Sequence, residues 1–217
     1  MGTERQIHPG GATRDTGDDE PMGEPMSDEH VLAQALHDLG AAVWFGGSVM
    51  GVVGVNSSGA DLEAGIDRVR VASSAWNRFA PIQWAGIAAT VGAGLRLTQV
   101  GGRRLALQEG FGRTGAVKAA VTLLGAAATA YAAYCGQRIG TLAEDVHERG
   151  EPLEVRDATR PTAATPAEIA RWQGRQRLVQ YAVPLLAGAN IALNSSLVQS
   201  YRAGATATGV ARRILPV

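Results

Sequence analysis

Charged side chains are almost absent from the long apolar stretches of this chain. Asp38, Arg96 and Lys118 are the three charged residues in 89 residues of such sequence, whereas the whole chain has 40, and His37 precedes Asp38. A charge inside a bilayer is costly and is expected to pair or to reach the surface. These four residues therefore predict an intramembrane polar cluster, with Asp38 paired to Arg96 and Lys118 as a second partner. A proton or ion site is the functional alternative to such a structural ion pair.

Two asparagines lie in the last apolar stretch. Asn190 and Asn194 are four residues apart, which places both on one face of a helix. Amides at membrane depth form interhelical hydrogen bonds worth roughly 0.6–2 kcal/mol each. We expect an interhelical polar face here, and the lining of a pore is the alternative.

His37 also invites a cofactor hypothesis. Together with Trp44, Gly46 and Gly47 it is similar to the first helix of copper-export membrane domains and of four-helix membrane haem proteins. A second ligand is hard to supply, because His147 is expected on the opposite side of the membrane. His30 lies two turns away, about 10 Å, which is too far to bind one ion with His37. We therefore expect no metal ligand set and no cofactor, and keep a haem- or metal-binding redox protein as the alternative.

The composition excludes several classes of protein. Lys plus Arg and Asp plus Glu both number 20, so no bulk positive charge is available for nucleic acid. One Cys excludes an intrachain disulfide framework and a Cys-rich zinc site. The sequence holds no phosphate-binding loop, nucleophile elbow or metal-hydrolase motif. We assign no catalytic residue and expect a protein that is not an enzyme.

The apolar stretches have the length of membrane spans. A helix rises about 1.5 Å per residue and needs about 20 residues to cross a hydrocarbon core. Backbone groups in lipid must be paired internally, so each stretch must be helical. We predict an all-α bundle of four transmembrane helices within a membrane domain at 31–202. The spans are expected at 33–55, 80–100, 116–137 and 178–200.

A soluble, alanine-rich helical bundle is the alternative to the membrane fold. The mean hydropathy of −0.01 is low for a membrane protein, and the third stretch is only moderately apolar. A soluble bundle helix, however, carries charged or polar residues along one face. The near absence of charge from all four stretches favours the membrane.

The predicted spans are separated and flanked by polar segments. Residues 1–30 are expected to form a disordered tail, and 203–217 a C-terminal tail. Between the first two spans, 61–80 has an apolar helical face and is predicted to be a short amphipathic helix in the membrane interface. A connecting helix packed on the end of the bundle is the alternative.

The longest loop is expected from Arg138 to Arg177, with an irregular middle. Thr165-Pro166-Ala167-Glu168 matches a capping box with proline in the first turn, which predicts a helix start at Thr165. This helix is expected to run into the fourth span and to bend near Pro184.

Several strings resemble those of a family of small actinobacterial four-helix membrane proteins. The resemblance covers about residues 30–200 and implies a four-helix membrane fold and no chemistry. The strings are His37-Asp38-Leu39-Gly40, Trp44-Phe45-Gly46-Gly47-Ser48-Val49-Met50-Gly51, Gly54-Val55-Asn56, Arg70-Val71-Ala72, Trp76, Arg78-Phe79-Ala80-Pro81, Thr165-Pro166-Ala167-Glu168 and Pro184.

These observations predict a multi-pass protein of the cell membrane with a structural, accessory or oligomeric role. Its expected partners are the lipid bilayer and either a second copy of the chain or another membrane protein, and not nucleic acid. A small transporter or channel is a further alternative. Four spans place both termini on one side. The arginines near the span ends favour cytoplasmic loops at 56–79 and 138–177, but that orientation would require translocation of the long hydrophilic N-terminal tail, so we expect both termini in the cytoplasm.

Overall fold

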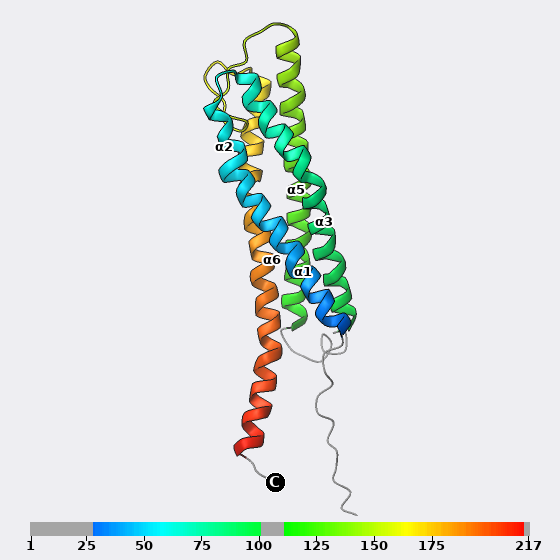
Figure 1. The fold of residues 1–217 in the computed structure, drawn as a ribbon. Coiled ribbons are helices and arrows are strands. Elements are labelled where there is room, and N and C mark those ends of the chain that lie inside the picture. Colours follow the sequence, from blue (N-terminus) through cyan, green and yellow to red (C-terminus); the bar gives the residue numbers. More distant parts are fainter. Residues whose placement is uncertain (1–27, 101–110, 215–217) are drawn as a thin grey trace, which may run out of the picture.

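The computed structural model describes residues 28–100 and 111–214, and this part of the chain is helical apart from its connections (Figure 1). Its one β-type pairing is an isolated bridge between Val155 and Pro161. The elements are α1 (Asp28–Met50), the π-helical turn η1 (Gly51–Val55), α2 (Asn56–Ser58), the 3₁₀ turn η2 (Gly59–Asp61), α3 (Gly65–Val100), α5 (Phe111–Glu148) and α6 (Ala167–Ile214).

The four long helices run alternately up and down in one bundle. The beginning of α1 and the end of α6 lie at the same end, and the connection between α5 and α6 lies at the other (Figure 1). Helix α1 packs closely on α3, and α5 packs closely on α6, whereas contacts between these two pairs are fewer. We call α1 with α3 the N-terminal pair and α5 with α6 the C-terminal pair.

Glycines allow the close approach within the N-terminal pair. A Cβ atom on Gly40 would lie 2.5 Å from the backbone oxygen of Gly86, so the two helices touch through their backbones there. A Cβ on Gly47 or Gly51 would instead meet the ring of Phe79 or Trp76, at 2.1 Å in each case. The glycine pair at 47 and 51 therefore accommodates aromatic rings of α3.

The buried apolar residues form two clusters at different heights. One fills the middle of the bundle around Trp44, and it contains Ile87, Val183 and Ala187. The other lies at the end where α5 and α6 are connected. Its members are Ile66, Val69, Ile139, Ala143, Val146, Leu153, Val155 and Ile169.

Within the described residues, three helical segments are long and apolar enough to cross a membrane. They are Asp28–Asp61, Arg113–Glu148 and Ala167–Val198. Helix α3 is not among them. Its polar Gln83 and Thr90 are only 5% and 2% exposed, whereas its apolar Ile82 and Leu95 are 57% and 60% exposed. The polar groups that lower the hydropathy of α3 are thus of two kinds: Gln83 and Thr90 face its neighbours, whereas charged residues such as Arg70 and Arg96 are exposed. Three such helices indicate a membrane protein.

The segment predicted as a separate interfacial helix is the first part of α3. The helix begins at Gly65 and continues without interruption through Pro81 to Val100. Ile66 and Val69 are buried against α5 and the loop before α6, so this apolar face contacts protein. The prediction of a separate short helix was therefore wrong, and the alternative of a helix packed on the end of the bundle agrees with these contacts.

The helices extend past the expected boundaries. Helix α1 begins at Asp28, so residues 28–30 are helical, and the rest of the predicted disordered tail lies outside the described residues. Helix α6 continues through Pro184 to Ile214, so most of the predicted C-terminal tail is helical. Helix α5 continues to Glu148, which shortens the loop predicted from Arg138.

The start of α6 lies close to the predicted cap. Its first backbone hydrogen bond runs from Ala170 N–H to the carbonyl of Pro166. The Thr165 hydroxyl, however, donates to the carbonyl of Glu154 and accepts from the backbone N–H of Thr162. Thr165 therefore holds the preceding loop, although the helix begins within a residue or two of the predicted position.

Candidate functional site

The predicted polar residues near the start of α1 form a hydrogen-bonded network. Both carboxylate oxygens of Asp38 accept from Gln34 Nε2 at 2.9 Å. Asp38 Oδ1 also lies 3.1 Å from Nδ1 of the buried His37 and accepts from Asn194 Nδ2 at 2.8 Å. The last of these bonds joins α1 to α6.

Asn194 connects the two groups that the sequence analysis treated separately. Its Oδ1 accepts from Lys118 Nζ at 2.6 Å while its Nδ2 donates to Asp38. One turn earlier, the fully buried Asn190 donates to the Thr122 hydroxyl of α5. Asn190 and Asn194 thus both make hydrogen bonds to neighbouring helices.

Arg96 does not join this network. It donates to Glu29 at 2.8 Å, and the two side chains are 54% and 76% exposed. Among the residues that the structure describes, no ion pair links Asp38 to Arg96, so the predicted pair was wrong. The prediction rested on equal depth in the membrane, but depth does not fix the direction in which a side chain leaves its helix. The long Arg96 side chain reaches the first turn of α1, and Lys118 meets Asp38 through Asn194.

The side chains of this network are hydrogen-bonded to one another across different helices. Bonds of Asp38 and Asn194 tie α1 and α5 to α6. Across residues 28–100 and 111–214, no three His, Cys, Asp or Glu side chains lie close enough together to hold a metal ion. The geometry of this cluster favours interhelical packing.

A second polar region, which the sequence analysis missed, surrounds a cavity of about 510 Å³ in the other half of the bundle. The residues lining it come from all four long helices and from the loop before α6, and none of them is ionisable. Its polar lining residues are Ser48, Asn56, Ser73, Asn77, Gln83, Thr129, Gln137, Thr141, Thr159, Gln176 and Gln180.

The π-helical turn η1 borders this cavity and orients Asn56. Asn56 is 3% exposed, donates to Gln180 Oε1 at 2.8 Å and accepts from Trp76 Nε1 at 2.8 Å. One amide therefore joins α2, α3 and α6. Single π-helical turns inside α-helices recur at functional sites because they shift the register of the following residues. Here, Asn56, the residue that links three helices, directly follows the turn.

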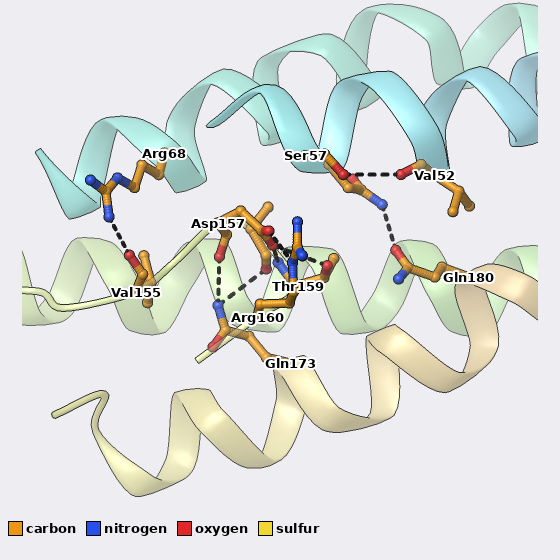
Figure 2. A network of polar contacts seen from close by, with 11 residues as sticks. Val52, Ser57, Arg68, Val155, Asp157, Thr159, Arg160, Gln173 and Gln180 are labelled. Atoms are coloured by element: carbon orange, nitrogen blue, oxygen red, sulfur yellow. Dashed lines mark hydrogen bonds and ion pairs between the residues drawn. The ribbon is translucent and has the colours of Figure 1, made fainter. Parts of the chain in front are cut away.

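The loop between α5 and α6 closes this end of the bundle (Figure 2). Arg68 of α3 donates to the carbonyl of Val155 at 2.6 Å, and Gln173 of α6 donates to the carbonyl of Asp157 at 3.0 Å. The Asp157 carboxylate is fully buried and accepts from Thr159 N–H at 2.8 Å and from Arg160. The loop is thus fixed to both helix pairs.

The bonds between the two helix pairs occur at several heights. Trp44 Nε1 donates to Thr129 at 3.1 Å in the middle of the bundle. Asn56 donates to Gln180 towards the loop end, and Asn194 donates to Asp38 towards the end where α1 begins. The bonds of Trp44 and Asp38 join α1 to the C-terminal pair, and the bond of Asn56 joins α2, between α1 and α3, to α6.

Buried amides in α6 retain unused hydrogen-bonding capacity. Among the described residues, Gln173 Oε1, Gln176 Oε1 and Asn190 Oδ1 are buried without a partner. Only Gln176 of these three lines the cavity. The sequence carried a signal for this region, because Gln173, Gln176 and Gln180 recur at helical spacing on one face.

The comparisons with known proteins give no match: no family model, no curated protein and no solved structure is similar to this chain.

Proposed function

We propose that this chain is a four-span protein of the cell membrane with a structural or accessory role, which it performs without catalysis. The observation that carries the proposal is the position of α3. Its residues 80–100 lie beside the apolar part of α1, and its Gln83 and Thr90 are buried while Ile82 and Leu95 face outwards.

The contact between Gly40 and Gly86 sets the height of α3 relative to α1. Gly40 lies within the predicted first span, and Gly86 lies within the predicted second span. If α1 crosses the hydrocarbon core, this part of α3 lies in the same layer. The resemblance to small actinobacterial four-helix membrane proteins is consistent with such an arrangement.

The number of spans can be tested by the positions of the two termini. Four crossings place the two ends of the chain on the same side of the membrane, whereas three crossings place them on opposite sides. Reporter fusions before Met1 and after Val217 should both give a cytoplasmic signal. Opposite signals would reject the four-span proposal, and two extracytoplasmic signals would reject the orientation. The protein should also stay in the membrane pellet after an alkaline carbonate wash.

The structural role rests on the bonding of the ionisable groups. Asp38 and Lys118 both bond to Asn194, so their polar atoms already link helices. A proton pathway through this region would depend on these two groups. Proteoliposomes containing the wild-type chain should therefore leak protons no faster than proteoliposomes containing the double variant Asp38→Asn/Lys118→Met. A faster leak through the wild-type chain would reject the structural role in favour of transport.

A further inference from the structure

The cavity near the loop end has the dimensions of a ligand site. Its volume of about 510 Å³ falls within the range of roughly 300–1,000 Å³ that is typical of small-molecule pockets. Val52, Trp84 and Ala132 supply apolar surface, and amides and hydroxyls supply the polar part. Because no lining residue is ionisable, a charged ligand would find no compensating charge there.

The cavity exists because one face of α5 carries small side chains. Ala132, Ala133, Gly136 and Gly140 all line it, and a Cβ atom added to Gly136 would meet nothing within 4 Å. The opposing face of α3 contributes Ala72, Ser73, Asn77 and Ala80. Both helices thus leave space at the same height.

The cavity continues towards the surface between α3 and α5. A shallow hollow beside it is lined by Arg70, Arg78 and Glu144, and it shares Ser73, Asn77 and Gly140 with the cavity. Asn77 is exposed. On the side of the loop, Ala158 and Thr159 close the cavity. A ligand therefore has a lateral route between the two helix pairs.

The amide of Gln176 supplies the polar feature that a ligand would satisfy. The side chain is 7% exposed and lines the cavity, and its Oε1 has no hydrogen-bond partner among the described residues. A buried acceptor without a donor is unfavourable. The last torsion of a glutamine side chain is broad, so rotation of the amide can turn the oxygen towards the cavity.

Gln83 offers a second acceptor on the opposite side. Its Nε2 donates to the Ser48 hydroxyl at 3.2 Å, which fixes the orientation of the amide. Both residues line the cavity. Two glutamine carbonyls, one on α3 and one on α6, thus favour a ligand that donates hydrogen bonds.

From these observations we infer that the cavity binds an uncharged, membrane-soluble molecule with an apolar body and a hydroxyl donor, that is, a lipid-soluble alcohol or phenol. The apolar body lies against Trp84 and Ala132, and the hydroxyl donates to Gln176. This inference goes beyond the proposed structural role and does not depend on the number of spans.

The test uses the purified full-length chain in detergent and two small aromatic probes. 2-Naphthol has a hydroxyl donor, whereas 2-methoxynaphthalene has nearly the same shape but no donor. Equilibrium dialysis, with the uptake by empty micelles subtracted, should show saturable binding of 2-naphthol. The methoxy compound should bind about tenfold more weakly, because the hydrogen bond to a buried acceptor is lost. Equal affinities for the two probes would refute the role of the donor.

Two variants and one matched control separate the ligand site from a merely structural cavity. Gly136→Leu places a side chain in the cavity and should abolish saturable binding of both probes. Gly46→Leu is the control, because Gly46 is exposed and a Cβ atom added there also meets nothing within 4 Å. This variant should bind both probes as the wild type does. Gln176→Leu removes the unpartnered acceptor. It should raise the melting temperature and also remove the preference for 2-naphthol. A structural amide would not affect that preference.

Competition with a neutral lipid shows whether the ligand is a membrane lipid or a compact solute. Monoolein carries free hydroxyls on an acyl chain, and displacement of 2-naphthol by monoolein would support the inference with a membrane lipid as ligand. Saturable 2-naphthol binding that monoolein does not displace would support it with a compact solute as ligand. Absence of saturable binding by the wild-type chain, or binding that survives Gly136→Leu, would overturn the inference.

Discussion

Gly40→Ala should destabilise the bundle, although alanine favours helices more than glycine does. The new Cβ would lie 2.5 Å from the Gly86 carbonyl oxygen and 3.0 Å from the Thr90 backbone nitrogen. These are backbone atoms, so no side-chain rotation relieves the contact and α1 must move away from α3. Overpacking of this kind costs about 1–3 kcal/mol. The gain from replacing glycine by alanine in a helix is about 1 kcal/mol, so the net loss is up to about 2 kcal/mol.

Gly46→Ala is the matched control for this prediction. Gly46 lies on the same helix, is exposed, and a Cβ added there meets nothing within 4 Å. Both variants gain the same helix propensity, so the difference between their unfolding free energies isolates the contact with α3. We expect a difference of about 1–3 kcal/mol, measured by denaturant unfolding in detergent micelles and followed by tryptophan fluorescence. If Gly40→Ala is as stable as Gly46→Ala, the close approach of α1 and α3 at this height is wrong.

Three further predictions concern the polar bonds and the buried thiol. Asn194→Leu should lower the free energy of unfolding by about 1–3 kcal/mol because it removes hydrogen bonds to two ionisable groups. Arg96→Ala should change the free energy of unfolding by less than about 1 kcal/mol because the ion pair of Arg96 with Glu29 is exposed. If Arg96→Ala destabilises the chain more than Asn194→Leu in the same assay, the network is contradicted. Asp157→Ala should make the loop before α6 susceptible to limited proteolysis, since the buried carboxylate accepts from the loop backbone, and an unchanged cleavage rate would count against that role. Cys135 is fully buried, so a maleimide should label it only after unfolding, and rapid labelling of the folded chain would show that its surroundings are different.

The sequence predicted the long helices because charge is nearly absent from them and because a bilayer requires internal backbone pairing. It placed their ends less well. Helix α5 continues beyond its predicted span because the extra turns pack on other protein elements, as Val146 does in the cluster at the loop end, whereas the start of α6 near Thr165 was predicted. The apolar face at 61–80 was recognised, but hydrophobic periodicity does not distinguish a face covered by protein from one covered by lipid.

The polar residues near the start of α1 were partly predictable. The expectation that Asp38 and Lys118 lie close together follows from their similar predicted depth at the same face of the membrane. In the structure, both residues contact Asn194. Arg96 was assigned to the wrong partner because depth does not determine which way a side chain leaves its helix. The partner of Glu29 was not foreseen for the same reason.

The cavity was missed because it is defined by side chains that are small. Gly136 and Ala132 fit an alanine-rich helix of any kind, and only the position of α3 shows that no neighbour fills the space beside them. Gln176 and Gln180 did offer a signal, since polar residues at helical spacing next to a predicted span must face protein or water. The partner of Gln180 is Asn56, which follows the π-helical turn η1, and the sequence gives no pattern for that turn.

The division into two helix pairs has a consequence for how the protein is made. Because the ribosome synthesises α1 and α3 before α5 and α6, the N-terminal pair can form first through its close glycine contacts. At that stage, the indole of Trp44 has not met Thr129, and Asp38 has not met Asn194. These groups are polar sites that the C-terminal pair later satisfies. Biogenesis of this bundle therefore passes through a half-built state in which the Trp44 indole lacks its final partner and Asp38 has only its contacts within α1, and both groups favour joining the correct second half over dispersal in lipid.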